Sequence, residues 1–151
     1  MTNIIFDQAP PVFKNYLKLI FGRKKGVPGD GHLPEISITL PKVEVPGALL
    51  SRFVKISKLP NTDYLPITFP YVLAGPVHLA LMAHPDFPVK AAGLLHLRNR
   101  INYPENIPTG QGFSLSVQTS SSRFRPQGFE FEIITSVKIN DKVYWECKST
   151  F

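Results

Sequence analysis

The segment that most constrains the fold is residues 75–82, which read Gly-Pro-Val-His-Leu-Ala-Leu-Met and are apolar on almost every side. A helix that is apolar all round has no face for water and must be buried. Pro76 suits the first turn of such a helix, where the missing N–H is not needed, so we expect the helix to begin near Gly75. The rest of the chain must therefore supply a surface that surrounds this helix.

The residues that follow alternate between apolar and polar types, which is the pattern of half-buried strands. Four such runs cover residues 95–103, 113–117, 129–139 and 143–151. Between the last two runs, Asn140-Asp141 predicts a tight hairpin turn. An antiparallel sheet with one apolar face is closed most simply by wrapping around the buried helix, which predicts an α+β hot-dog fold.

The first of these runs carries two different faces. Leu95 and Leu97 are predicted on the apolar face, and His96, Arg98 and Arg100 on a wet, basic face. This pair of arginines is one of the two places where basic residues cluster. The other is the tight run of Arg23, Lys24 and Lys25 near the N-terminus.

The N-terminal part has a different pattern. Residues 10–20 carry apolar side chains at steps of three and four, with lysines on another face, which predicts an amphipathic helix. The Gly- and Pro-rich residues 26–34 predict a flexible junction, so we divide the chain into a helix and link over 1–30 and a hot-dog domain over 31–151. Within that domain we expect short strands over residues 35–45, a helix over residues 49–54 and an irregular loop over residues 58–70.

Size and charge narrow the classes of function. The 151 residues fit one globular domain, and 17 Lys and Arg against 11 Asp and Glu give a net charge of +6. This charge favours an anionic partner such as a phosphate or a lipid surface. The basic residues lack the aromatic interleaving of a nucleic-acid interface, so we expect no nucleic acid. The first helix with its basic run fits an anionic membrane surface, although docking on its own or a partner domain is the commoner arrangement.

Several kinds of site are excluded by what the chain lacks. Its single cysteine, Cys147, permits no internal disulfide and no cysteine zinc cluster, and its position on an apolar strand predicts a buried, inert thiol. The four histidines show no metal-ligand spacing, so we expect no metal and no cofactor. A cytoplasmic location is expected from the lack of a signal peptide or a long apolar run. The chain ends at Phe151 within a predicted strand, which is typical of a truncated product or of one half of a longer protein.

Two stretches resemble a known family: residues 65–82, LPITFPYVLAGPVHLALM, and residues 93–101, GLLHLRNRI, with Phe87-Pro between them. They resemble MaoC-type acyl dehydratases, which are similar to (R)-specific enoyl-CoA hydratases. The similarity covers residue 33 to the C-terminus and is to the N-terminal, non-catalytic half of members with two hot-dog domains. It implies binding of acyl thioesters, as acyl-CoA or acyl-carrier protein, and pairing with a second hot-dog domain or with a second copy as a homodimer.

The resemblance also implies where substrate would bind. Backbone N–H groups at the start of the buried helix would polarise the thioester carbonyl, and guanidinium groups of the strand would bind phosphates. For His78 the alternative is a buried histidine satisfied by a backbone carbonyl, and for the arginines it is a solvated surface. The implied substrate-binding residues are Tyr71, Gly75, Pro76, His78, His96, Arg98 and Arg100.

The chain departs from the family in its chemistry. Hydration of an enoyl thioester needs a carboxylate and an imidazole, which the family supplies from an Asp-x-Asn-Pro-x-His loop before the buried helix. The loop here contains Asn61, Thr62 and Asp63, and no histidine occurs between residues 34 and 77, so we expect no catalytic residue. Asp63 alone is typical of a turn. Two alternatives stay open: an active hydratase or thioesterase that uses His78 and Asp63, and a basic protein that binds lipid at a membrane surface.

Overall fold

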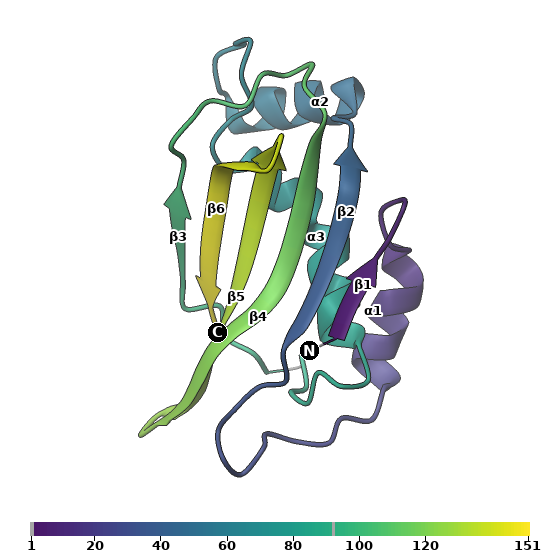
Figure 1. Cartoon of the computed structure of the whole chain (residues 1–151), viewed down its shortest axis with the longest axis vertical. Helices are drawn as coiled ribbons and strands as arrows, with labels where there is room; N and C mark the ends of the chain where they lie inside the picture. The colour runs from purple at the N-terminus through teal and green to yellow at the C-terminus, as the bar shows by residue number, and fades with distance from the viewer. Residues whose placement is uncertain (1, 92) are drawn as a thin grey trace.

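The fold is a six-stranded sheet wrapped around one helix, seen in a computed structural model that describes residues 2–91 and 93–151 (Figure 1). The first two strands of the spatial order pair in parallel, and all other neighbours pair antiparallel. The expected α+β class is therefore confirmed. The spatial order is β1 (Thr2–Ile5), β2 (Ile36–Val43), β4 (Phe113–Arg125), β5 (Gly128–Ile139), β6 (Lys142–Thr150) and β3 (Arg98–Asn102).

The inner face of the sheet packs on α3 (Phe69–Ala83), which Figure 1 shows crossing behind β2 and β4. Side chains alternate along the long strands as the sequence predicts, with every second one buried. Trp145 on β6 fixes the start of α3, because its indole Nε1–H donates to the carbonyl of Ile67 at 2.7 Å. The core so formed includes Phe69, Val77, Leu81, Leu115, Val117, Phe131, Ile133, Val137 and Trp145.

The buried helix begins six residues earlier than expected. It starts at Phe69, so Pro70 occupies the first turn and Pro76 lies in the helix interior. The prediction that the helix starts near Gly75 is wrong, as is the part of the predicted loop that covers residues 69 and 70. Burial of the residues before Gly75 on the sheet outweighs the hydrogen bond that Pro76 cannot donate to the carbonyl of Val72.

Two further helices match their predicted positions. α1 (Val12–Phe21) packs beside α3, and α2 (Gly47–Ser57) lies across one end of the sheet (Figure 1). The turn at Asn140-Asp141 is confirmed, because both residues have positive φ, 49° and 62°, as a tight hairpin requires. Among the described residues, no helix combines the length and the apolar composition of a membrane span.

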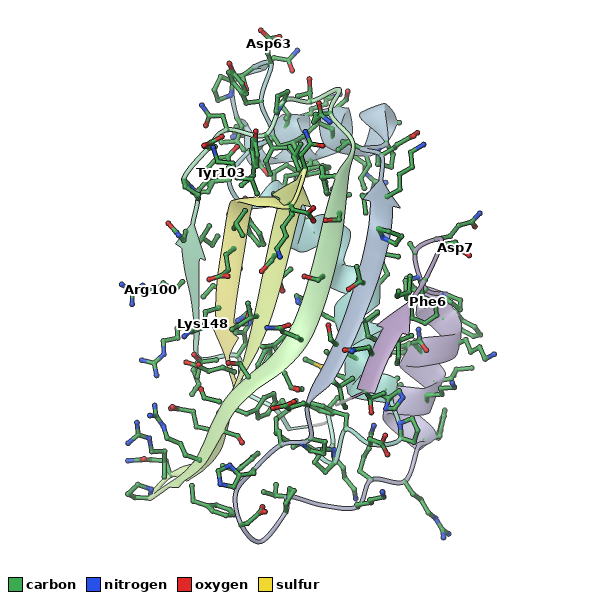
Figure 2. All side chains as sticks on the ribbon, in the orientation of Figure 1. Phe6, Asp7, Asp63, Arg100, Tyr103 and Lys148 are labelled. Atoms are coloured by element: carbon green, nitrogen blue, oxygen red, sulfur yellow. The ribbon has the colours of Figure 1, made fainter. Side chains whose placement is uncertain are left out.

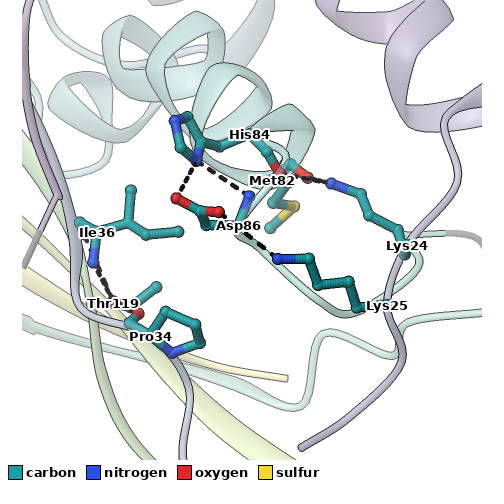
Figure 3. A network of polar contacts seen from close by, with 8 residues as sticks. All are labelled: Lys24, Lys25, Pro34, Ile36, Met82, His84, Asp86 and Thr119. Atoms are coloured by element: carbon teal, nitrogen blue, oxygen red, sulfur yellow. Dashed lines mark hydrogen bonds and ion pairs between the residues drawn. The ribbon is translucent and has the colours of Figure 1, made fainter.

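The N-terminal strand and the Gly- and Pro-rich link are both hydrogen-bonded to the rest of the fold. β1, which the sequence pattern did not indicate, pairs along β2. The link over residues 26–34 is held by hydrogen bonds, from the Gly26 N–H to the carbonyl of Pro88 and from the Leu33 N–H to Ser122 Oγ. Near its end, Thr119 Oγ1 accepts from the Ile36 N–H and donates to the carbonyl of Pro34 (Figure 3). The division of the chain into units over 1–30 and 31–151 stays a prediction.

Candidate functional site

A group of polar side chains lies between α3 and the edge of the sheet formed by β6 and β3. Ser149 on β6 is fully buried, and its hydroxyl donates to Asn99 Oδ1 at 2.7 Å. The same hydroxyl lies 3.3 Å from the hydroxyl of Tyr71, which projects from α3. Asn99 Oδ1 also lies 2.8 Å from Nε2 of His96. We name the set Tyr71, His78, His96, Asn99, Thr135 and Ser149 the inner polar cluster; His78, Thr135 and Ser149 are buried, and His96 and Asn99 form its exposed rim.

His78 enters this cluster from the middle of α3. Its Nε2 lies 2.7 Å from Thr135 Oγ1, and its ring centroid lies 4.9 Å from that of Tyr71. Burial, together with the nearby His96, lowers the pKa of His78 to about 4. The imidazole is therefore neutral near pH 7 and acts as a hydrogen-bonding group rather than a cation. Its partner is a side-chain hydroxyl and not the backbone carbonyl of the alternative interpretation.

His96 does not share a face with the arginines, contrary to the prediction. Its ring stacks on Phe151 with centroids 4.7 Å apart and an interplanar angle of 19°, and it faces Tyr71 at 6.2 Å. The physical reason is that β3 begins only at Arg98, so strict alternation does not extend back to His96. For the same reason Leu95 and Leu97, predicted on the apolar face, are exposed.

A cavity of about 790 Å³ lies next to this cluster, between the tip of the β4–β5 hairpin and the segment that leads into β3. Phe151 belongs to both places, because it lines the cavity and stacks on His96. Most of the other lining side chains are apolar, and the polar ones lie at the hairpin end. Its apolar lining includes Leu94, Leu95, Leu97 and Phe129, and its charged lining consists of Arg125 and Glu130.

Three arginines surround Glu130 at this cavity. Arg123 contacts Glu130 Oε1 through both Nε and Nη2, Arg98 Nη2 lies 3.6 Å from Oε2, and Arg125 Nε lies 3.9 Å from Oε1. The hydrogen bond from Arg123 is the main cause of the lowered pKa of Glu130. Arg125 and Glu130 line the cavity, and Arg98 and Arg123 adjoin it through their contacts with Glu130. One carboxylate neutralises one of the three guanidinium groups, so an excess of positive charge lies beside the cavity. We name these three residues the arginine group.

The structure separates the remaining predicted site residues from this place. Arg100 points away from the edge of the sheet (Figure 2) and does not line the cavity. Gly75 and Pro76 lie inside α3, so the backbone N–H groups that lack helical partners belong to the first turn at Phe69 rather than to Gly75. The expected polarising helix start at Gly75 is therefore wrong.

Asp63 is also distant from the inner polar cluster. It is exposed in a loop at the end of the molecule (Figure 2), where its carbonyl accepts from the Thr109 N–H. His78 lies nine residues beyond the start of α3, about 14 Å further along the helix axis. Asp63 and His78 thus do not form an acid–base pair in this chain.

The described part of the chain contains neither a cluster of metal ligands nor an exposed thiol. No group of three or more His, Cys, Asp or Glu side chains is placed to hold a metal ion there. Cys147 is buried, and burial raises the pKa of its thiol. The thiol is therefore protonated near pH 7, as expected for an inert cysteine.

Sequence reasoning missed several members of the site. The inward position of Ser149 could have been predicted, because alternation along the strand places it on the same face as the inward-facing Trp145 and Cys147. Asn99 has the same parity as the inward Ile101. Arg125 lies at the tip of a hairpin, where no periodic pattern places a side chain.

Comparison with known proteins gives one curated relative at low identity and no family model. No family model matches the chain. The 3-hydroxyacyl-thioester dehydratase X of Mycobacterium tuberculosis is 25% identical over 142 residues, which are 94% of this chain and 51% of that protein. The chain thus spans about half the length of this relative.

Solved structures give the same result for the fold. The crystal structure of HtdX of Mycobacterium tuberculosis matches with a TM-score of 0.70 and 23% identity, over 76% of this chain and 49% of that one. The HadBC (3R-hydroxyacyl-ACP dehydratase) complex from the same organism matches with a TM-score of 0.65 and 15% identity, over 79% of this chain and 96% of the other. The predicted hot-dog fold is confirmed.

Proposed function

We propose that this chain, a relative of the MaoC-type acyl dehydratases with their hot-dog fold, binds acyl thioesters and depends on a second hot-dog domain for hydratase or dehydratase activity. The observation that carries this proposal is the pairing of an apolar cavity with the arginine group at its border. Pockets that bind small molecules are mostly apolar, with a few placed polar groups that fix orientation. An acyl thioester of coenzyme A or of a carrier-protein arm has this combination of an apolar chain and phosphates.

The arginine group supports the phosphate end of the ligand. Guanidinium groups bind phosphate oxygens in a fork, and two of the three positive charges here are not neutralised by Glu130. Arg98, which the sequence predicted for this role, belongs to the group, and Arg123 and Arg125 join it. We leave Arg100 out of the role because it neither lines the cavity nor contacts Glu130.

The inner polar cluster supports the thioester end. Phe151 connects it to the cavity: His96 stacks on that ring, Tyr71 faces His96, and His78 contacts Tyr71. Burial raises the pKa of the Tyr71 hydroxyl, so this group stays protonated and can donate to a carbonyl oxygen. Such groups position a thioester without attacking it. We therefore assign Tyr71, His78 and His96 to substrate positioning.

Binding is tested by calorimetric titration of the chain with decanoyl-CoA. We expect saturable binding that weakens about tenfold in Arg98→Gln and in Arg125→Gln, because each removes a charged hydrogen bond to phosphate. Arg52→Gln is the matched control, since it removes the same charge from an exposed position on α2 outside the cavity, and light scattering checks that all variants have the same oligomeric state. Decanoyl-pantetheine, which lacks the phosphates, should bind equally to all four proteins. Absence of any saturable binding to decanoyl-CoA would contradict the proposal.

Catalysis by the chain alone is tested separately with crotonyl-CoA. We expect no hydration, because the chain lacks the Asp-x-Asn-Pro-x-His loop and keeps Asp63 apart from His78. Hydration that disappears in His78→Ala would instead support the rival hypothesis of an active enzyme with unusual residues. A role in fatty acid metabolism and a location in the cytoplasm stay predictions that accompany this proposal.

A further inference from the structure

The first helix turns its apolar face to solvent. α1 packs beside α3 with Asn15 buried and Leu19 half-buried, while most of its large apolar side chains remain outside. Phe13 and Phe21 are 75% and 77% exposed, and Ile5 on the neighbouring β1 is 71% exposed. The exposed patch, which we name the α1 patch, consists of Ile5, Val12, Phe13, Tyr16, Leu17, Ile20 and Phe21.

The α1 patch is bordered by positive charge. The residues at steps of three and four from Phe13 form one stripe of the helix, and Lys14 and Lys18 are exposed beside it. Arg23 follows at the end of the helix and is also exposed. No Asp or Glu occurs between residues 8 and 29, so no carboxylate of this segment offsets these cations.

Contacts with α3 hold α1 in this orientation. Lys24 Nζ donates to the carbonyls of Met82 and His84, at 2.7 and 2.9 Å, at the end of α3 (Figure 3). Lys25 lies 3.9 Å from Asp86 in the same place. An amphipathic helix that docks on its own domain buries its apolar stripe, whereas this helix is fixed with the stripe outward.

We propose that the α1 patch lies on the surface of an anionic lipid bilayer. A helix with a bulky apolar face and lysines beside it lies in the plane of the interface, with its apolar side chains among the lipid tails and its cations on the headgroups. Charge decides between this occupant and a second copy of the chain. A two-fold dimer through the patch would bring like-charged lysine borders together, whereas anionic headgroups complement them.

The position of α1 separates this surface from the proposed pairing of hot-dog domains. Figure 1 shows α1 on the side of the molecule where β1 ends the sheet, and β3 ends the sheet at the opposite edge. A second hot-dog domain that continues the sheet from β3 therefore leaves the α1 patch uncovered. The inference stands independently of acyl thioester binding.

The test is flotation of the full chain with vesicles of phosphatidylcholine, with and without phosphatidylglycerol. We expect binding to the anionic vesicles that falls with added salt, and weak binding to phosphatidylcholine alone. The double variant Phe13→Ser, Phe21→Ser should lower the bound fraction at least about tenfold. Ile56→Ser is the matched control, because Ile56 is 70% exposed on α2, outside the patch, and should leave binding unchanged.

A second variant protects the test against a folding defect. Lys14→Glu, Lys18→Glu changes only exposed charges and should also abolish binding to anionic vesicles while circular dichroism stays that of the parent chain. Equal binding of the parent chain and both double variants would overturn the proposal, as would no flotation of the parent chain. If light scattering shows a dimer that Phe13→Ser, Phe21→Ser converts to a monomer, a second copy covers the patch and the proposal is wrong.

Discussion

At the scale of single residues, His78 illustrates how burial determines what a side chain can do. The sequence places a histidine on an apolar helix, and its packing against Tyr71 and Thr135 removes it from water. Because the cationic form would lose its hydration, the pKa of His78 falls to about 4. The same residue type at an exposed position would titrate near neutral pH. Position in the fold, and not residue type, therefore decides its protonation state.

This burial predicts a pH dependence of stability. In the unfolded chain His78 takes up a proton near its ordinary pKa of 6.5, but in the folded chain only near 4. Between these values the unfolded state binds more protons, so the contribution of His78 to stability is complete above pH 6.5 and is lost as the pH falls toward 4. The loss is less than about 4 kcal/mol.

Urea unfolding at a series of pH values measures this effect. His78→Phe should flatten the acid side of the stability profile, and should cost about 1 kcal/mol near pH 7 because the bond to Thr135 is lost. His32→Gln is the control, since His32 is exposed and its loss should keep the profile of the parent chain. Identical acid slopes in the parent chain and His78→Phe would contradict the assignment.

At the scale of elements, α3 shows that a helix can continue through proline when burial favours it. Pro70 lies in the first turn, where no helical hydrogen bond is lost, whereas Pro76 leaves the carbonyl of Val72 without its helical donor. The eight buried residues of α3 lie on both sides of Pro76. Packing against the sheet therefore holds the two halves of the helix together.

Pro76→Ala should make the chain more stable. The alanine supplies the missing N–H and removes the clash of the proline ring with the preceding turn, which stabilises the helix. Lost packing of the ring and the greater freedom of the unfolded chain oppose this, so we expect a net increase in the free energy of unfolding of about 1 kcal/mol. Pro70→Ala is the matched control and should give no gain, because its N–H falls among those that have no helical partner. Urea unfolding of both variants provides the measurement. A less stable Pro76→Ala would mean that the ring itself is needed for packing on the sheet.

At the scale of the whole molecule, the sheet ends in two different edges. β1 ends it on one side, and β3 ends it on the other with a row of exposed residues. An exposed edge strand is a template for pairing with another chain. We therefore place the proposed second hot-dog domain, or a second copy of this chain, along β3. In a two-fold pair of copies the central residue, Arg100, would face its own counterpart.

This arrangement predicts salt-dependent self-association. Two opposed Arg100 side chains repel one another, so light scattering should show more dimer as salt is added. Arg100→Cys should form a disulfide-linked dimer on mild oxidation, because opposed residues of paired strands lie within reach of a disulfide. Asn3→Cys on β1 is the control and should stay unlinked, and the buried Cys147 does not compete. A monomer at every salt concentration that forms no linked dimer would count against pairing of copies through β3.

The molecule as a whole also shows what sequence patterns can predict. The amphipathic repeat of α1 and the alternation in β4, β5 and β6 appear in the structure where the sequence placed them, and so does the turn at Asn140-Asp141. For the site, Arg98 and the cluster members Tyr71, His78 and His96 come near one cavity, while Arg100, Gly75 and Pro76 lie elsewhere. The prediction failed for the second group because the face on which a strand residue lies, and the residue at which a helix starts, depend on element boundaries. A periodic pattern does not show where these boundaries fall.

The sequence by itself determined α1, α2 and the three long antiparallel strands, because the period of apolar residues along a helix or strand depends on near neighbours in the chain. Tertiary structure alone decided the start of α3 at Phe69, the stacking of His96 on Phe151, the pairing of β1 with β2, and the contact of Arg98 with Glu130. Each of these depends on packing between residues far apart in sequence. Burial against a distant partner outweighs local preference at such places, and no local pattern records it.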